Sequence, residues 1–528
     1  MVVSKSFMLI DSRPCRAWLL AAALIAAVLG AWLAFPPTGF YQDDWFTMED
    51  SARGRTLLDA VHAFAARGWN WRRPAQIVLM PLAHRAALNR PAVAAGILAF
   101  LVALEALLLY GLVRRMTGRA ATALAVTGFV LLYPGRPSFQ MWFADILQTT
   151  AQPLVLGGLW LYRDWVESRR PARLFLALGL YLAGASCYEA AFFLPLILLA
   201  DPAILPGAGP WRMRLRRVAA RTWPLALAMA AAVLWNQVIL AWITSTALRP
   251  PSWSLGLALK GLGAGFECVS SRVLHECLRS VGPALRGFSA GHWLLAAALA
   301  IFFAWALESA LRREAEALPT TWWVGTAAAF LGAYLPYAFS GGYQPTMHGI
   351  MSRTNGAGAW VFGMLAAGIL ASWPASWSRF RPWCLGLAAM LLLPANWTQR
   401  QDWARAWREQ QRILDDIRIQ AKDIPGPATI VLSSSLYVGD VVVFDAPYDF
   451  DSALHLAINR KDLTGAIDSW RFRFRPDRAL EAPGGQFVRE YSYDRMFLYD
   501  PQTRELLRVS GPPDARWAKE HPARLIQL

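Results

Sequence analysis

Charged residues are scarce in this chain of 528 residues: only 17% are Asp, Glu, Lys or Arg, whereas 56% are hydrophobic and 26 are Trp. In soluble domains about a quarter of the residues are charged. The mean hydropathy of +0.30 points the same way. Composition therefore excludes an ordinary soluble protein and indicates an integral membrane protein.

Cysteine is also scarce, and five residues are too few for a disulfide framework. Three of them fall in or beside apolar runs and are expected to be inert. Cys268 and Cys277 share the loop sequence FECVSSRVLHEC, for which a disulfide and two free thiols are both open alternatives. A metal site built from these two residues and His275 is disfavoured, because no fourth ligand is evident.

Long apolar runs recur between Ala17 and Trp397, each near the ~20 residues that a helix needs to cross a bilayer. The first run follows Arg13 and Arg16, as in a signal peptide, but without a convincing cleavage site, so a retained helix is preferred. One helix per run predicts a polytopic α-helical domain over residues 1–397 with about eleven crossings: 17–35, 91–113, 120–134, 145–163, 173–187, 189–201, 223–243, 291–311, 321–339, 357–376 and 381–397.

The net charge of +16 comes from short basic clusters between these runs, such as RRMTGR and WRMRLRR. That distribution is a topology signal and not a nucleic-acid-binding surface. With the clusters in the cytoplasm, the N-terminus lies inside, the C-terminal domain lies in the periplasm, and the predicted location is a bacterial inner (plasma) membrane. Four loops then face outward: 36–74, 133–144, 244–290 and 340–356. The first and third carry apolar residues at helical spacing, which predicts helices along the membrane surface.

Residues 398–528 are more polar and predict a small soluble α/β or α+β domain. Trp403, Trp407, Ile413, Leu414 and Ile417 recur at three- and four-residue spacing, as on one face of a helix. The runs ATIVLSS, VVVFDAP, QFVREYSY and RMFLYD follow, separated by turn residues, and are expected to form strands. The domain shows no phosphate-binding glycine loop and is interpreted as a cap on the outer face.

The stretch FYQDDWFTMED places Asp43 and Asp44 in the first outer loop, directly after the first crossing. With 36 acidic residues in the chain, about two or three adjacent acidic pairs are expected by chance, and three occur, so adjacency alone carries no information. The position of the pair is informative, since aromatic residues flank it at a predicted membrane boundary. A carboxylate in such a rim has its basicity raised by desolvation, which suits a general base.

Other polar residues are assigned to the same side of the membrane. They are Arg73 before Pro74, Arg136 and Asp145 around a turn, Glu189 at the tip of the hairpin at 173–201, and His348 with Arg353 in a glycine-rich loop. Each alone is more typical of an interface anchor. Together they combine carboxylates with several arginines, which is the chemistry of a base that faces a phosphate leaving group.

At this point the order of motifs resembles the GT-C fold glycosyltransferases that use polyprenyl-phosphate sugars, the class of protein O-mannosyltransferases and lipid A aminoarabinose transferases. The resemblance covers roughly Ala17 to Trp397. It rests on the acidic pair, the Arg-Pro at residues 73 and 74, and the segments NRPAVAAGILAFLVALEALLLYGLVRRMTG, LLYPGRPSFQMWFADILQTT and CYEAAFFLPLIL. Tyr188 stands where the family often has Lys before the Glu, and the C-terminal domain matches no accessory domain of the family.

The resemblance implies transfer of one sugar, with inversion, from a polyprenyl-phosphate carrier to a hydroxyl of a cell-envelope glycan, lipid or protein. Asp43 or Asp44 would be the general base, with Asp43 favoured. The phosphate would be bound by Arg73, Arg136, Arg353 and His348, while Asp145 and Glu189 would orient the acceptor or bind an optional divalent cation; no cofactor is required.

A transporter or flippase for lipid-linked sugar is the main alternative function. Transporters show charged residues at mid-membrane and inverted repeats. Glu105 is the clearest acidic residue inside a predicted helix, but no repeat is visible. A non-catalytic scaffold is a third alternative, for which replacement of Asp43 or Asp44 by Asn would have no effect.

Overall fold

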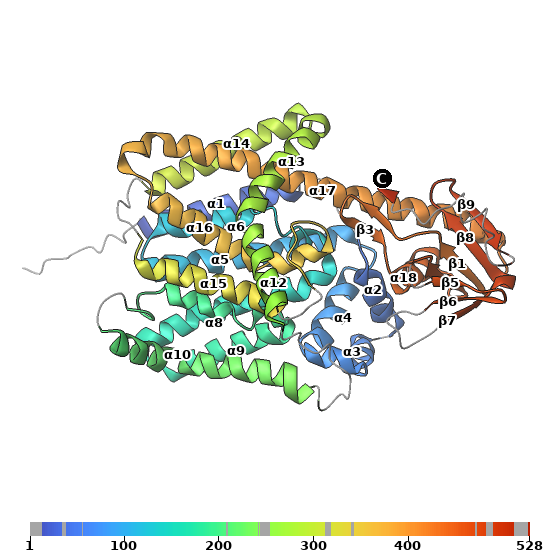
Figure 1. The fold of residues 1–528 in the computed structure, drawn as a ribbon, viewed down its shortest axis with the longest axis horizontal. Helices are drawn as coiled ribbons and strands as arrows, with labels where there is room; N and C mark the ends of the chain where they lie inside the picture. The colour runs from blue at the N-terminus through green and yellow to red at the C-terminus, as the bar shows by residue number, and fades with distance from the viewer. Residues whose placement is uncertain are drawn as a thin grey trace, which may run out of the picture.

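A computed structural model describes residues 13–33, 39–54, 56–206, 210–240, 242, 254–311, 318–338, 343–469, 472–481, 489–509, 511 and 526–527 of the chain. The described chain is mainly helical, with a smaller sheet region at its C-terminal end. Figure 1 shows the helices gathered at one end of the long axis and the strands at the other. Three short helices, at Asp43–Arg53, Leu57–Ala65 and Gln76–Ala86, lie between these two parts.

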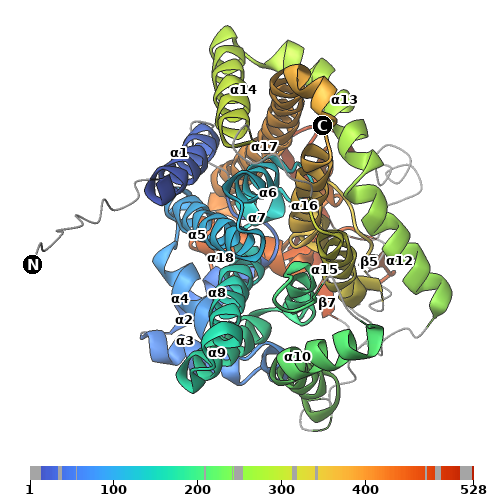
Figure 2. The same ribbon diagram turned by 90° about the vertical axis from the view of Figure 1, so that its left-hand side faces the viewer.

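The helices of the first part are mostly long and run close to the long axis, so that Figure 2 views many of them end-on. In chain order they are α1 (Arg13–Leu33), α2 (Asp43–Arg53), α3 (Leu57–Ala65), α4 (Gln76–Ala86), α5 (Pro91–Thr117), α6 (Ala120–Leu132), α7 (Ser138–Met141), α8 (Ile146–Ser168), α9 (Pro171–Cys187), α10 (Trp211–Leu234), α12 (Leu255–Cys268), α13 (Ser271–Gly287), α14 (Ala290–Leu311), α15 (Thr320–Ala338) and α16 (Gly358–Ala371).

Three of these helices are long and apolar enough to cross a membrane by length and composition: α5, α10 with its π-helical extension to Ile239, and α14. Shorter apolar helices occur at Ala17–Leu33, Ala120–Leu132, Pro171–Cys187, Glu189–Ala200 and Gly358–Ala371. The predicted helical character is confirmed, but among the described residues three helices meet the criteria for a crossing, fewer than the eleven predicted. The helices predicted along the outer loops are present as α3, α12 and α13.

The hairpin predicted around Tyr188 has a different second half. Tyr188 is extended and ends α9, but the following segment forms two 3₁₀ helices, η3 (Glu189–Ala191) and η4 (Leu194–Ala200). Pro195 has no backbone N–H to give to a longer helix. This segment packs closely against helix α15 because α15 has a glycine at the contact. A Cβ on Gly325 would lie 2.2 Å from the backbone nitrogen of Ala200. Small residues at such crossings let backbones approach.

The last predicted crossing and the amphipathic helix of the tail are one continuous helix, α17 (Arg381–Gln420), of 40 residues. At 1.5 Å per residue it is about 60 Å long and reaches from the helical part into the sheet region (Figure 1). The predicted boundary between residues 397 and 398 thus falls inside a helix. The predicted inward face is confirmed, since Trp403, Ile413, Leu414 and Ile417 are buried and Trp407 is partly buried against the core.

In its described residues the C-terminal region contains three small sheets and one α-helix after α17, α18 (Pro447–Ile458). In the largest sheet the strand order is β4-β1-β8-β9, with β1 parallel to both β4 and β8 and with β8 antiparallel to β9. All four predicted strand runs contain a strand. The strands are β1 (Ala428–Leu432), β2 (Leu436–Val438), β3 (Val441–Phe444), β4 (Leu463–Ile467), β5 (Phe472–Phe474), β6 (Arg478–Glu481), β7 (Arg489–Ser492), β8 (Met496–Asp500), β9 (Glu505–Val509) and β10 (Ile526–Gln527).

The disulfide considered for the third outer loop is not formed. Cys268 and Cys277 are both buried, free thiols. Within the described ranges, no group of three or more His, Cys, Asp or Glu residues could hold a metal ion. The two cysteines instead act as small apolar residues that pack α12 and α13 against the helical part.

One buried ion pair lies in the centre of the helical part. Arg136 donates from Nη1 to both carboxylate oxygens of Glu105, at 2.8 and 3.0 Å, and Trp360 donates from its indole to Glu105 at 2.7 Å. The side chains of Arg136 and Glu105 are 1% and 0% exposed. A buried charge is tolerated only with such partners. The pair therefore fixes α5, α16 and the turn after α6 relative to one another.

Replacing Glu105 by Gln should destabilise the protein by about 3–5 kcal/mol, because it leaves the Arg136 guanidinium buried without its counter-charge. Thermal unfolding of the purified protein in detergent measures the loss. A double variant, Glu105→Leu with Arg136→Met, should regain most of it. Unchanged stability of Glu105→Gln would show that the pair does not hold these elements together.

Candidate functional site

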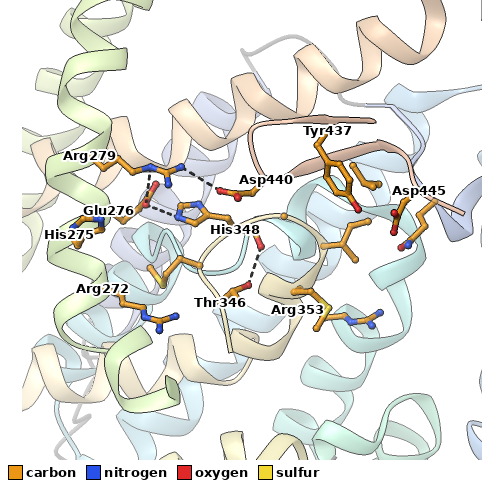
Figure 3. Close-up of a pocket in the computed structure, with 16 residues that line it drawn as sticks. Arg272, His275, Glu276, Arg279, Thr346, His348, Arg353, Tyr437, Asp440 and Asp445 are labelled. Carbon is orange, nitrogen blue, oxygen red and sulfur yellow. Dashed lines mark hydrogen bonds and ion pairs between the residues drawn. The ribbon is translucent and has the colours of Figure 1, made fainter. Parts of the chain in front are cut away.

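A cavity of about 630 Å³ lies where the helical part meets the sheet region. Figure 3 shows that its wall comes from three places: α13, the loop that carries His348 and Arg353, and the turn between β2 and β3 with Asp440. Gln42, the residue directly before the acidic pair, also lines it. The cavity thus combines three of the loops predicted to face outward, 36–74, 244–290 and 340–356, with a part of the tail.

Arg353 is the cation of this cavity that has no anionic partner. No hydrogen bond or ion pair of its guanidinium occurs within the described part of the chain, and its Nε is buried without a partner. Its Cζ lies 5.2 Å from the centre of the Trp142 ring and 5.0 Å from that of Tyr343. Aromatic faces hold a guanidinium in place without consuming its hydrogen-bond donors. Arg353 is therefore positioned and free to bind an anion.

His348, the other predicted ligand of phosphate, has a carboxylate partner. Its Nε2 lies 2.9 Å from Oε2 of Glu276, a residue on α13 that is buried. Burial alone would raise the pKa of Glu276, but the contact with His348 and the nearby Arg279 bring it below its usual value. Arg279 also lies 3.6 Å from Asp440 on the opposite wall (Figure 3). These four side chains form a charged bridge across one side of the cavity.

The two acids of the pair lie at the start of α2, where carboxylates suit the positive end of the helix dipole. Their surroundings differ. Asp43 is half-buried, and its Oδ1 accepts a hydrogen bond of 2.9 Å from the hydroxyl of Tyr448 on α18. Asp43 also lies within electrostatic reach of Arg353. Its second oxygen has no hydrogen bond within the described part of the chain.

Asp44 is fully buried and engaged through both oxygens. Oδ2 accepts from the backbone nitrogen of Tyr41 at 2.9 Å, and Oδ1 lies 3.3 Å from Nε2 of His84. Since the carbonyl of Met80 can only accept, His84 donates to it from Nδ1. Burial raises the pKa of Asp44, although the contact with His84 opposes this. Both oxygens of Asp44 are therefore in contact with protein groups in the interior.

Arg73 and Glu189 form a bidentate ion pair with N–O distances of 2.5 and 2.8 Å. The Cζ of Arg73 also lies 3.9 Å from the centre of the Tyr188 ring. Asp145, buried at the start of α8, acts electrostatically on both Arg73 and Arg353. Arg73, Glu189 and Asp145 therefore form a charged group within electrostatic reach of Arg353.

Of the eight predicted residues, His348 and Arg353 line the cavity, and Asp43 and Asp145 lie within electrostatic reach of Arg353. Asp44, Arg73 and Glu189 do not line the cavity, and Arg136 is used elsewhere. Its guanidinium is paired with Glu105 in the core and does not line the cavity. Sequence reasoning missed the partners: Glu276, His84, Tyr448 and the aromatic pair around Arg353. The sequence did mark the place of Glu276, which lies in the FECVSSRVLHEC stretch. The cysteines and the histidine of this stretch, and not its glutamate, were the residues considered as ligands.

A comparison with models of known protein families and with curated protein sequences finds no match for this chain. The geometry above therefore carries the functional argument. The features of the described residues are a cation without an ion pair, a half-buried carboxylate with one oxygen that has no hydrogen bond, and a cavity of about 630 Å³. A reaction in which a hydroxyl loses a proton while an anion departs needs this combination.

Helix α2 is held to α18 by a second contact, which predicts a pH dependence. Ser452 donates to Glu49 at 2.7 Å, and Nδ1 of His455 lies 2.9 Å from the same carboxylate. The hydrogen bond to Glu49 raises the pKa of His455 above its ordinary 6.5. Although burial alone would raise the pKa of Glu49, hydrogen bonds from His455, Ser452 and Arg53 lower it to about 2.

The contact between His455 and Glu49 should stabilise the fold most between the ordinary pKa values of 4.5 and 6.5. A raised His pKa contributes stability that is lost as the pH rises through it, and a lowered Glu pKa contributes stability that is lost on acidification. His455→Gln should therefore cost about 1 kcal/mol at pH 6 and less at pH 9. Thermal unfolding across this range measures it. The same cost at both pH values, or the same pH dependence in a Glu49→Gln background, would contradict it.

Proposed function

We propose that this chain is a polytopic membrane glycosyltransferase, which moves a sugar from a polyprenyl-phosphate carrier to a hydroxyl of a cell-envelope acceptor on the outer face of a bacterial inner membrane. The acceptor O–H bond and the bond from C1 of the sugar to the phosphate oxygen break. A bond from C1 to the acceptor oxygen forms with inversion, the proton goes to a carboxylate, and the carrier departs as the phosphate.

The observation that carries the proposal is the state of Arg353. A guanidinium between two aromatic rings, on the wall of a cavity and without an anionic partner in the described ranges, leaves its paired N–H donors for a ligand. Planar pairs of donors match the oxygens of a phosphate. The negative charge on the phosphate grows as the sugar departs, so a fixed cation at this place favours the transition state more than the bound donor.

Asp43 is the better candidate for the base. Its free oxygen and its place next to the cavity-lining Gln42 favour it over Asp44, whose oxygens are both in use in the interior. Asp44 instead fixes the start of α2 through Tyr41 and His84. This assigns different roles to two carboxylates that are adjacent in the sequence.

The remaining predicted residues take supporting roles in the proposal. Glu189 holds Arg73 in a bidentate ion pair that largely cancels its charge, so Arg73 has a smaller part in binding the phosphate than Arg353. Asp145 acts electrostatically on Arg353, and His348 is held by Glu276 on the cavity wall. Arg136 has no part in catalysis, because Glu105 neutralises it in the core.

The proposal includes a membrane topology of about eleven crossings with the C-terminal region in the periplasm. The three long apolar helices and the five shorter ones support it by composition. The alternative of a transporter loses its main argument, since Glu105 has a structural partner and needs no transported ion to explain it.

Replacing Asp43 by Asn should lower the rate of sugar transfer by about 10²–10⁴-fold, because the acceptor proton then has no base. Transfer from a radiolabelled polyprenyl-phosphate sugar, with purified protein in lipid nanodiscs, measures this rate. Asp415→Asn is the matched control, since Asp415 belongs to another adjacent acidic pair and is exposed on α17. Full activity of Asp43→Asn would exclude Asp43 as the base.

Arg353→Gln should lower the transfer rate by about 10²–10³-fold, since it removes one fixed stabiliser of the departing phosphate. Arg353→Lys should recover only part of this loss, because a point charge cannot offer paired donors. The exposed Arg495 provides the control, Arg495→Gln. A variant Arg353→Gln that keeps the donor KM and the kcat of the unaltered protein would contradict the assignment of phosphate to this residue.

A further inference from the structure

The half-buried carboxylate of Asp43 is held by a residue that lies 405 positions later in the chain. Tyr448, in the first turn of α18, donates its hydroxyl to Oδ1 of Asp43 at 2.9 Å. A phenol hydroxyl supplies one donor of defined direction. Because Oδ1 is engaged in this way, the carboxylate cannot rotate freely, and Oδ2 is the oxygen left for an incoming hydroxyl.

Tyr448 is itself fixed by the packing of α18 on α2. Its ring lies edge-on to Phe46, with 5.6 Å between the ring centres. Farther along both helices, Ser452 and His455 contact Glu49. Positions 448, 452 and 455 repeat at helical spacing, as do 43, 46 and 49, so that one face of α18 contacts one face of α2. Two points of contact along each helix determine how α18 is rotated.

The phenol of Tyr448 stays protonated and can therefore keep donating its hydrogen bond to Asp43. Burial, together with the nearby Asp43 carboxylate, raises the pKa of Tyr448 above its ordinary value, so the phenol keeps its proton. The loop before α18 is ordered by Asp449, which accepts from the backbone nitrogens of Asp445 and Ala446. Asp445 lines the cavity from the same side. The region that was interpreted from the sequence as a cap therefore reaches into the candidate active site.

We infer that Tyr448 is a positioning residue for Asp43, and that the C-terminal region completes the catalytic unit by orienting the base towards the cavity. This inference rests on the proposed function. Tyr448 touches neither the sugar nor the phosphate; it acts through Asp43. Its effect should fall on the chemical step, since the donor-binding arginines do not contact it in the described part of the chain.

Tyr448→Phe removes one hydroxyl and keeps the ring. The full-length variant in lipid nanodiscs should lose up to about 100-fold in kcat, as expected when a catalytic group is misplaced by a small distance, while the KM for the donor stays within about twofold. The matched control is Tyr499→Phe, which loses a hydrogen bond of the same kind, 2.7 Å from Tyr499 to Asp416, away from the cavity. The control should retain full transfer activity.

A second readout does not depend on sugar transfer. In a double-mutant cycle of Asp43→Asn and Tyr448→Phe, the thermal stability lost by the double variant should be smaller than the sum of the two single losses. Additive losses would overturn the contact. A coupled pair with unchanged kcat in Tyr448→Phe would overturn the positioning role. If the unaltered protein transfers no sugar, the proposed function is wrong, and the role of Tyr448 is wrong with it. This outcome is measured first, before any variant is compared.

Discussion

The pairing of buried charges is the constraint on which this structure depends. An ion in an apolar interior is costly unless an opposite charge or several hydrogen bonds accompany it. In the interior Arg136 has Glu105 and Asp44 has His84, and the partly exposed Arg73 has Glu189. These pairs connect elements far apart in the sequence and determine how the helices and the loops meet. In the described part of the chain the guanidinium of Arg353 has aromatic neighbours and no ion pair, and it lies on the cavity wall, where we propose that the phosphate of a ligand binds it.

The second feature that organises the molecule is the continuity of α17. Because the helix runs without a break from an apolar stretch into a polar, amphipathic one, the C-terminal region is rigidly joined to the helical part. Tyr41 donates to the carbonyl of Trp403 on this helix at 2.6 Å, and Trp45 donates to Gln410 at 3.3 Å. Helix α2, and with it the acidic pair, is therefore held between α17 and α18.

The class of fold was predictable because periodicity and composition record burial directly. The inward face of α17 and the four strand runs follow from the spacing of apolar residues alone. The 3₁₀ geometry of η4 was not predictable, since it depends on the close approach of α15, and neither was the merging of the last crossing with the tail. Among the site residues, the positions of Asp43, Arg73 and Arg353 relative to the apolar runs were enough to predict that the three lie on one side of the membrane. The partners that distinguish them, such as Tyr448 and Glu276, come from distant segments that no local pattern connects.

The most direct measurement of the central claim is a cryo-electron microscopy structure of the full chain with a bound polyprenyl phosphate. The account predicts phosphate density within hydrogen-bond distance of the Arg353 guanidinium, about 3 Å, with Asp43 facing the same cavity and Arg136 still paired with Glu105. Phosphate density bound to other residues, with Arg353 turned towards a carboxylate of the protein, would contradict the account.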